Sequence, residues 1–397
     1  MMRAIINFFL LLITVIISSQ VNAKTQSSLT IEEMRVANAV VAIPTIKEYF
    51  NWSMFKDQWP HITDHSVAQR AMARLGDEIW QHSKVQVQSG KIVDDRPLYW
   101  NRLAIKHFIK QSPSIFLESE LNALLEVFEN SSRGYSDLGF SQQTNKKILL
   151  TGFDPFLLDR NLEQSNPSGL NALLLDGKVI RYQTSINGKL QTITAEINTV
   201  MIPVRFEDFD QGEIESLLAP FYATNSVDMI ATISMGRRNF DLEHFPGLRR
   251  SSKAPDNLNV YTGAALNNPV IPLFTDKPLA SEEFVEYSLP FQAMMQAKGD
   301  FKVKDNRSVT ILTSGKANDI IAVNLAELSD KVSVQGGGGG YLSNEISYRS
   351  IRLRNMLKSN IATGHIHTPS IKSFDRLTNK KITAQIEAML ILALPEI

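Results

Sequence analysis

Two segments near the carboxyl end of the chain contain the residue types that nucleophilic catalysis uses. In the first, five consecutive glycines at positions 336–340 lead into Tyr341, Leu342, Ser343 and Asn344, and an amphipathic stretch follows. A glycine-rich turn before a helix leaves backbone N–H groups free to bind an anion, so a nucleophile there would have an oxyanion site beside it. Ser is also a preferred N-cap residue, which gives Ser343 a purely structural interpretation as well.

The second segment is Gly364-His365-Ile366-His367-Thr368-Pro369. Two histidines at i and i+2 could bind a metal on a strand. However, the chain has no cysteine and no helical His/Glu pair lies nearby, which disfavours zinc. A single general base is the preferred interpretation, and we expect neither a metal nor a cofactor.

Two earlier segments follow short apolar runs. A glycine-containing turn after residues 148–150 carries Phe153 and Phe156, and their rings could cover a small ligand or simply fill the core. Glu243 follows the apolar run at 227–233. It could orient a catalytic histidine or be a solvated loop acid.

The elements that must position these residues alternate between strand and helix. Apolar runs at 148–150, 227–233 and 308–312 predict strands, and helical stretches lie between them. This alternation predicts an α/β fold, with a mostly parallel sheet covered by helices on both faces and chemistry at the carboxyl ends of the strands. Residues 258–285 are expected to form a loop-rich insertion.

The first third of the chain has a different pattern. Apolar residues recur at three- and four-residue spacing, which predicts a small helical domain over residues 24–145, with all four tryptophans in its core. Residues 131–147 are rich in Ser, Gly and Asn and are expected to be a linker. The α/β domain then spans residues 146–397.

Residues 1–23 resemble a secretory signal peptide. Arg3 precedes an apolar run at 4–17 that is shorter than a membrane-spanning helix, and Val21-Asn22-Ala23 precedes the expected cleavage site. The mature protein is expected to begin near Lys24 and to be periplasmic or secreted, without stable membrane insertion. Basic and acidic side chains number 41 each, which argues against a nucleic-acid partner.

Five sequence words, in order, resemble those of pyroglutamyl peptidase I (pyrrolidone-carboxylate peptidase). The resemblance covers about residues 146–375. The words are Thr151-Gly152-Phe153-Asp154-Pro155-Phe156, Asn166-Pro167-Ser168, Glu243 followed by Pro255-Asp256-Asn257, Gly339-Gly340-Tyr341-Leu342-Ser343-Asn344, and Gly364 to Pro369.

The resemblance implies the α/β/α sandwich of that family and removal of an N-terminal pyroglutamyl group. It assigns the nucleophile to Ser343, the general base to His367 and the orientation of the base to Glu243. It also implies that Phe153 and Phe156 enclose the pyrrolidone ring. The other positions that it assigns to substrate binding are Asn166, Lys253 and Tyr341, and those assigned to the oxyanion turn are Gly339, Gly340 and Asn344.

Three departures from the family pattern bear on activity. Ser343 stands where the family has cysteine, Leu157-Leu158 replace a Gly-Gly pair, and Lys253 stands where an arginine is expected. The two leucines are expected to narrow or reshape the ring pocket. Because a hydroxyl is less acidic than a thiol, a Ser nucleophile would depend wholly on His367.

Two functions remain open from the sequence. One is an exported amidase that uses a Ser-His-Glu triad on a peptide or small-molecule amide. The other is an inactive homologue that binds capped peptide N-termini or serves as a scaffold.

Overall fold

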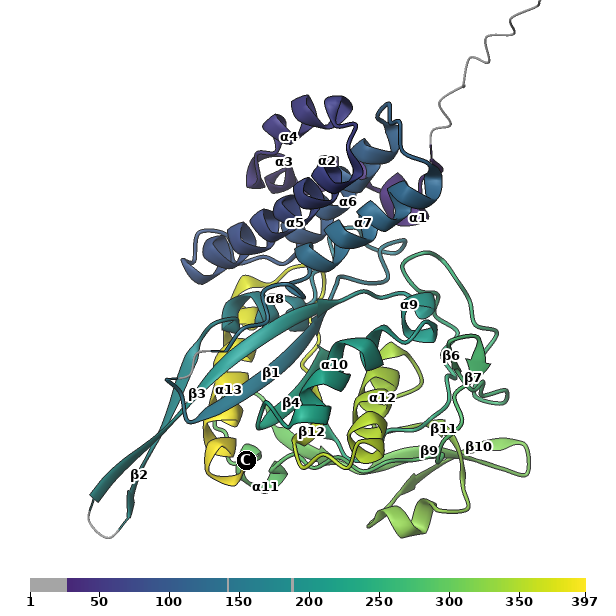
Figure 1. Ribbon diagram of the computed structural model, residues 1–397. Coiled ribbons are helices and arrows are strands. Elements are labelled where there is room, and N and C mark those ends of the chain that lie inside the picture. Colours follow the sequence, from purple (N-terminus) through teal and green to yellow (C-terminus); the bar gives the residue numbers. More distant parts are fainter. Residues whose placement is uncertain (1–26, 141–142, 187–188) are drawn as a thin grey trace, which may run out of the picture.

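The computed structural model describes residues 27–140, 143–186 and 189–397 (Figure 1). A group of helices is stacked on a larger α/β part. The predicted leader, residues 1–23, lies outside the described residues. Within the described ranges no helix combines the length and hydropathy needed to cross a bilayer.

The amino-terminal region is helical, as its residue spacing predicts. Helices α5 and α7 pack along each other, and three of the four tryptophans are buried while Trp52 is half-buried. The helices are α1 (Ile31–Met34), α2 (Val36–Ala42), α3 (Thr45–Tyr49), α4 (Ser53–Gln58), α5 (His65–Gln88), α6 (Arg96–Gln111) and α7 (Glu118–Ser132).

A seven-stranded sheet forms the centre of the remainder, in the order β2-β3-β1-β4-β12-β5-β8. The pairs β3/β1, β1/β4, β4/β12 and β5/β8 are parallel, and the pairs β2/β3 and β12/β5 are antiparallel. The strands are β1 (Lys146–Phe153), β2 (Val179–Ile186), β3 (Lys189–Ile202), β4 (Met229–Met235), β5 (Phe240–Glu243), β8 (Val303–Asn306) and β12 (Ala362–Thr368).

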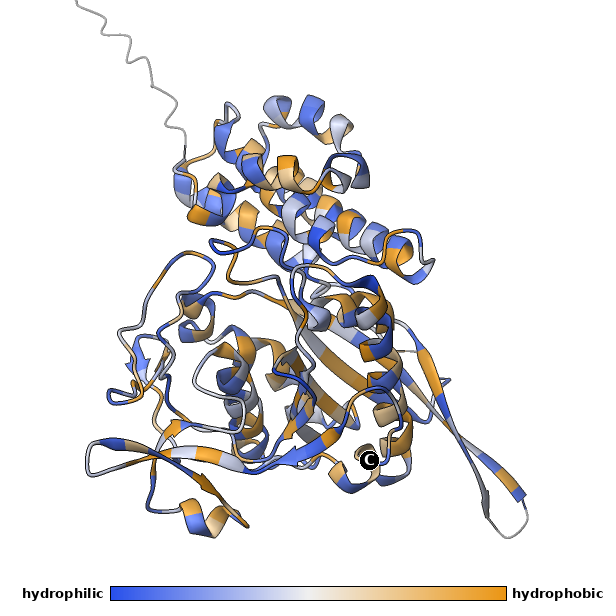
Figure 2. Cartoon of the chain, turned by 180° about the vertical axis from the view of Figure 1, so that it is seen from behind, coloured by the Kyte–Doolittle hydropathy of each residue, from blue (hydrophilic) through white to orange (hydrophobic). Residues whose placement is uncertain are grey.

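Helices cover both faces of this sheet, which confirms the predicted α/β class. Helices α8 (Pro167–Leu175) and α13 (Arg376–Ala393) lie on one face, and α10 (Glu213–Thr224) and α12 (Leu342–Met356) lie on the other. Along β1, Ile148 and Leu150 belong to the core with α13, whereas Leu149 belongs to the core with α10 and α12. Both faces of the strand are therefore apolar, as expected for a covered sheet (Figure 2).

The third predicted strand lies outside the main sheet. Residues 308–313 form β9 (Ser308–Thr313) of a separate antiparallel sheet with β10 (Lys316–Ile321) and β11 (Val332–Gln335). Val309, Thr310 and Ile311 are all buried, so this part of β9 is covered on both sides. So short an apolar run does not show which sheet a strand joins, which is why the sequence placed it wrongly.

The insertion and the remaining elements are short. Residues 258–285 are mostly loop, with a small hairpin of β6 (Leu273–Phe274) and β7 (Lys277–Pro278). Two short helices, α9 (Phe206–Asp210) and α11 (Phe291–Met294), follow β3 and precede β8, respectively.

The segment predicted as a linker is packed at its amino-terminal side. Ser131 and Ser132 are the last residues of α7, and Arg133 is almost fully buried. In addition, α5, α6 and α7 share one hydrophobic core with Leu170 and Leu173 of α8. The helical region is thus in extensive apolar contact with the α/β part.

A buried ion cluster joins the two parts at the turn after β1. The Asp154 carboxylate accepts from Nη1 of Arg102 at 3.0 and 3.1 Å, and Nη1 of Arg133 lies 2.7 Å from it. The three side chains are at most 2% exposed. Since Arg102 belongs to α6 and Arg133 follows α7, the helical region fixes the turn that carries Phe153 and Phe156.

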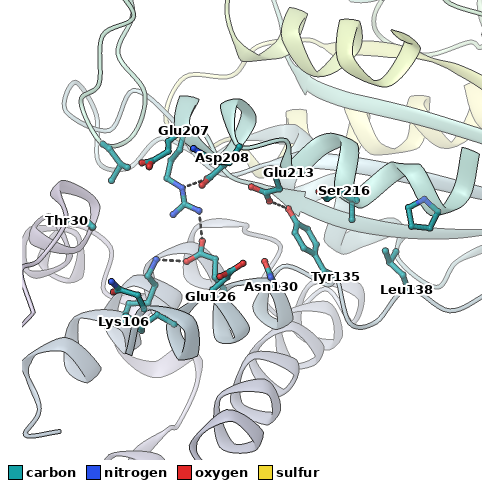
Figure 3. Close-up of a pocket in the computed structure, with 18 of the residues that line it drawn as sticks. Thr30, Lys106, Glu126, Asn130, Tyr135, Leu138, Glu207, Asp208, Glu213 and Ser216 are labelled. Atoms are coloured by element: carbon teal, nitrogen blue, oxygen red, sulfur yellow. Dashed lines mark hydrogen bonds and ion pairs between the residues drawn. The ribbon is translucent and has the colours of Figure 1, made fainter. Parts of the chain in front are cut away.

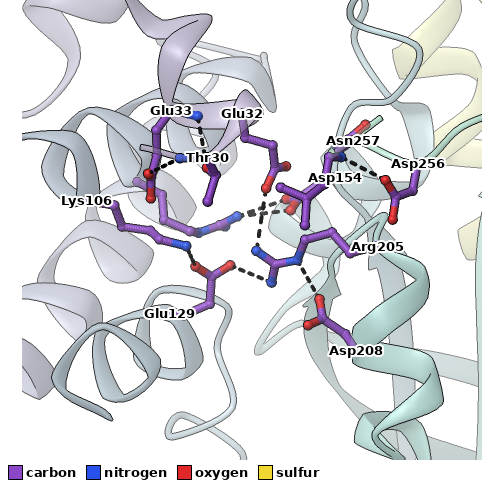
Figure 4. Close-up of polar contacts among 12 residues, drawn as sticks. Thr30, Glu32, Glu33, Lys106, Glu129, Asp154, Arg205, Asp208, Asp256 and Asn257 are labelled. Atoms are coloured by element: carbon purple, nitrogen blue, oxygen red, sulfur yellow. Dashed lines mark hydrogen bonds and ion pairs between the residues drawn. The ribbon is translucent and has the colours of Figure 1, made fainter. Parts of the chain in front are cut away.

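Glu129 of α7 continues this cluster toward α9 (Figure 4). Its carboxylate lies 2.5 Å from Nζ of Lys106 and 3.1 Å from Nη2 of Arg205, and Arg133 binds the same oxygen as Arg205. Burial alone would raise the pKa of Glu129, but Lys106, Arg205 and Arg133 hold this pKa well below its ordinary value. The ionised carboxylate is therefore the form that the folded state stabilises.

Replacing Asp154 tests the contribution of this cluster to stability. Asp154→Asn should lower the free energy of unfolding by about 3–5 kcal/mol, because two buried guanidinium groups lose their shared counter-charge. Urea denaturation is the measurement. Arg74→Met is the control, because it breaks an exposed pair with Glu78 and should cost no more than about 0.5 kcal/mol. Equal losses in both variants would contradict the assignment.

The stabilisation by Glu129 should also depend on pH. A depressed folded-state pKa stabilises the fold above the unfolded pKa of about 4.3, and this stabilisation is lost as the pH falls through the folded value. The stability difference between wild type and Glu129→Gln should therefore be largest near neutrality and shrink below about pH 4. A difference that is constant with pH, measured by urea denaturation, would be inconsistent with an ionised Glu129.

Candidate functional site

A small cavity lies where β1, β4 and α12 meet. Its volume is about 100 Å³. It is lined by Phe153, Phe156, Asn166, Val204, Ser234, Met235, Tyr341, Leu342 and Ser343. The structure thus brings together five residues that the sequence analysis assigned to one site, although they lie up to 190 positions apart in the chain.

Glu243 and His367 form a buried hydrogen-bonded pair beside this cavity. Oε1 of Glu243 lies 2.5 Å from Nδ1 of His367, and Glu243 is fully buried. Its second oxygen, Oε2, accepts from Nδ2 of Asn306 at 2.7 Å. With Nδ1–H donating to Glu243, the imidazole presents Nε2 as a proton acceptor.

The glycine turn connects this pair to Ser343. Asn306 Nδ2 also donates to the carbonyl of Gly337 at 3.0 Å, and Oγ of Ser343 donates to the carbonyl of Gly338 at 3.2 Å. A Cβ on Gly337 would lie 2.5 Å from Oε2 of Glu243, so a residue larger than glycine would have to displace this carboxylate. Among the described residues, no hydrogen bond joins Ser343 directly to His367.

Helix α12 begins at the cavity wall. Its N-cap residue is Tyr341, which makes no side-chain cap, and Ser343 is the second residue of the helix. The interpretation of Ser343 as an N-cap is therefore wrong. The first backbone N–H groups of a helix lack intrahelical partners, so this end of α12 offers N–H donors beside the Ser343 hydroxyl.

The aromatic residues of the cavity are held by their own contacts. Tyr341 donates its hydroxyl to the carbonyl of Pro255 at 2.8 Å, and its ring meets Phe206 edge-on. Phe153 stacks on Phe209 with ring centroids 6.3 Å apart. Both rings are thus fixed in the cavity wall.

Several predicted site residues have other surroundings. Lys253 is exposed and does not line the cavity. The side chain of Asn344 bonds the backbone N–H and carbonyl of Gly247 at 3.0 and 2.7 Å, so its amide is not directed to the cavity. Gly339 closes the turn with a φ of 88°, and the Gly340 carbonyl accepts from two backbone N–H groups, those of Ser251 and Ser252.

Leu157 and Leu158 do not narrow the ring cavity, which corrects the expectation from the sequence. Leu158 is 2% exposed and packs with Tyr99, Trp100 and Leu103 of α6. Leu157 lines a different cavity, next to Arg35. The apolar surface of α6 thus accommodates Leu158.

The sequence analysis missed three groups of site residues. Asn306, which holds Glu243, carries no local sequence signal. Arg102 and Arg133 fix the β1 turn from the helical region, and only their distant partner, Asp154, lies in a recognisable motif. Ser234 stands at a predicted strand end, and its position there was the one available signal.

A larger cavity lies between the helical region and α9–α10 (Figure 3). Its volume is about 870 Å³, and its charged lining includes Lys106, Glu129, Arg205 and Glu213. Tyr135 donates its hydroxyl to Glu213, and burial together with nearby Asp208 raises the pKa of Glu213 to about 7. These charged groups pair mainly with one another. The smaller cavity is therefore the better candidate for the functional site.

Metal ligation has no support in the described part of the chain. No group of three or more His, Asp or Glu side chains is arranged there to hold an ion. Both nitrogens of His365 contact hydroxyl groups, and Nδ1 of His367 contacts Glu243.

Family comparisons identify both parts of the chain. Residues 18–129 match the model of the PA0049 N-terminal domain, and residues 147–283 and 313–372 match that of the PA0049 C-terminal domain. The chain matches the PA0049 family over both of its domains. A curated relative, "Uncharacterized protein PA0049" of Pseudomonas aeruginosa, is 27% identical over 402 aligned positions, covering 79% of this chain and 71% of the relative.

Solved structures of low sequence identity are also similar to this chain. A mutant pyrrolidone carboxyl peptidase from Pyrococcus furiosus is 18% identical, with a TM-score of 0.40, over 63% of this chain and 99% of that chain. Pyroglutamyl peptidase I of Bacillus amyloliquefaciens is 18% identical, with a TM-score of 0.41, over 63% of this chain and 98% of that chain.

The close approach at Gly337 generates a test of the Glu243–His367 pair. Gly337→Ala should displace Glu243, because the added methyl group has no space, and should lower stability by about 1–3 kcal/mol. Proton NMR should show loss or a large shift of the downfield Nδ1–H resonance of His367. Gly139→Ala is the control, because no atom lies within 4 Å of its added Cβ. An unchanged His367 resonance in Gly337→Ala would refute the geometry.

Proposed function

We propose that this protein is an exported amidase that removes an N-terminal pyroglutamyl, or closely related, group from peptides. Ser343 is the nucleophile, His367 the general base and Glu243 the residue that orients the base. The observation that carries the proposal is the 2.5 Å Glu243–His367 hydrogen bond, which is joined through Asn306 and the glycine turn to a serine at a helix N-terminus.

The reaction begins with the Ser343 hydroxyl. Its proton turns from the Gly338 carbonyl to Nε2 of His367 while Oγ attacks the carbonyl carbon of the scissile amide. Glu243 stabilises the imidazolium that forms, and backbone N–H groups at the start of α12 stabilise the oxyanion. His367 then protonates the leaving amine as the C–N bond breaks, and water releases the acyl group by the reverse sequence.

The size and lining of the cavity fit a small cyclic acyl group. With about 100 Å³ and the rings of Phe153, Phe156 and Tyr341 in its wall, it has room for a five-membered ring but not for a long side chain. The same residues form the sequence words that resemble pyroglutamyl peptidase I. The helical region then holds the ring-binding turn in place through Asp154.

Serine in place of cysteine fits the proposed location outside the cytoplasm. A reactive thiol in an oxidising compartment is open to oxidation and mixed disulfides, and a hydroxyl is not. The chain contains no cysteine at all, which fits such a compartment. The lower acidity of the hydroxyl makes the base, His367, indispensable.

One observation favours a second candidate function, the binding of capped N-termini without hydrolysis. The Ser343 hydroxyl donates to the Gly338 carbonyl, and in the described structure it makes no hydrogen bond to His367. A serine held in this way lacks the contact that activates a nucleophile.

Hydrolysis of a pyroglutamyl amide with a chromogenic leaving group separates the two functions. Wild type should release the reporter, and Ser343→Ala should lower kcat by about 10⁴-fold or more. Ser347→Ala is the matched control, since this serine lies one turn further along α12, is fully buried and should leave kcat unchanged. Ser343→Cys should be active in reducing buffer because thiolate is the better nucleophile.

Inactivity of both wild type and Ser343→Cys would contradict the amidase. Binding of pyroglutamate by those same inactive proteins would then support the second candidate.

A further inference from the structure

Ser234 is a polar residue of the cavity that the proposed reaction does not use. It lies near the end of β4, and its Oγ is 2.7 Å from Nε2 of His365 in the neighbouring strand β12. Ser234 is 5% exposed and His365 is fully buried. This contact determines which way the Ser234 proton points.

His365 is a neutral imidazole held at both nitrogens. Its Nδ1 lies 2.7 Å from Oγ1 of Thr232. Burial, and secondarily the nearby His367, lower the pKa of His365 well below its ordinary value. A neutral imidazole carries one N–H and one acceptor nitrogen, so its two hydroxyl partners have opposite roles.

The Thr232 hydroxyl lies 3.4 Å from the carbonyl of Gly364 and 2.7 Å from Nδ1 of His365. When its proton is directed to the Gly364 carbonyl, its oxygen accepts from Nδ1–H of His365. Nε2 is then the acceptor nitrogen, and Ser234 donates its proton to it. The Ser234 oxygen therefore keeps only lone pairs for the cavity.

Two other hydroxyl groups of the cavity also have their protons engaged. Tyr341 donates to the Pro255 carbonyl and Ser343 to the Gly338 carbonyl. The hydroxyl oxygens of Tyr341 and Ser343 thus leave lone pairs toward a ligand, as the Ser234 oxygen does. Asn166 differs, because its amide donates one of its two N–H groups to the Asp154 carbonyl and its oxygen accepts from Ser168.

We propose that Ser234, through His365 and Thr232, makes the cavity selective for a ligand ring that carries an N–H donor, as in a cyclic amide. Ser234 accepts this N–H, and a ring with CH₂ or oxygen in its place leaves the buried Ser234 oxygen unpaired. The inference rests on the proposed function in taking this cavity as the ligand site, but it does not depend on hydrolysis.

Calorimetry with two stable ligands tests the selectivity. L-Pyroglutamate carries the N–H, and 3-oxocyclopentane-1-carboxylate has CH₂ at the same position of the ring. Wild type should bind the lactam at least about tenfold more tightly, because the analogue leaves a buried acceptor unsatisfied. Ser234→Ala should bring the ratio of the two affinities close to one, and Ser347→Ala should leave the wild-type ratio unchanged.

Thr232→Val gives a second variant whose substitution lies outside the cavity. Without the Thr232 acceptor, His365 has no partner for Nδ1–H and should place its proton on Nε2. The Ser234 proton is then released toward the cavity, and the preference for the lactam should fall. Nitrogen NMR of the imidazole should report Nδ1–H in wild type and Nε2–H in this variant, which keeps the proposal testable even if Ser234→Ala fails to fold.

The outcomes separate this inference from the proposed function. A retained lactam preference in a protein without amidase activity overturns the amidase alone. Equal affinity for the two ligands, no binding of either, or an Nε2–H tautomer in wild type overturns the role of Ser234, whether or not the protein hydrolyses amides.

Discussion

The position of one buried carboxylate, that of Asp154, determines much of the candidate site. It lies between the guanidinium groups of Arg102 and Arg133, and it belongs to the turn that carries Phe153 and Phe156. The cost of burying three charges is offset only when their geometry is well satisfied, so this cluster favours one arrangement of the turn. The helical region therefore contributes to the site without lining its small cavity.

The helical region reaches the same loop through other contacts. Arg35 lies 2.8 Å from Asp159, and Leu158 packs on α6. Asp95 accepts from the backbone N–H of Asn166 at 2.8 Å, and burial beside Asp94 raises the pKa of Asp95 to about 7. The loop between β1 and α8 is thus held from several sides.

The sequence allowed prediction of the elements whose signals are local. Alternating strand and helix patterns predicted the covered sheet, and the three- and four-residue spacing of apolar residues predicted the helices of the amino-terminal region. The separate sheet containing β9 was not predicted, because a short apolar run does not show which sheet its strand joins. Asn306 and Arg102 were missed because each acts through a partner more than 50 positions away.

The positions of the imidazole protons matter both for the proposed catalysis and for the proposed ligand selectivity. His367 donates to Glu243 through Nδ1 and keeps Nε2 for proton transfer, whereas His365 keeps its acceptor nitrogen for Ser234. Two histidines two positions apart on one strand thus have different tasks, because Nδ1 of His367 meets a carboxylate whereas both ring nitrogens of His365 meet hydroxyl groups. Burial keeps His365 neutral, which makes it suited to orienting a hydroxyl.

The identity of the nucleophile is the central claim, and covalent trapping tests it most directly. The protein would be treated with a fluorophosphonate that carries a pyrrolidone ring, digested and mapped by mass spectrometry. The account predicts a single phosphonylated residue, Ser343, and no adduct in a His367→Gln variant. An unmodified protein, or an adduct on Ser234 in place of Ser343, would contradict it.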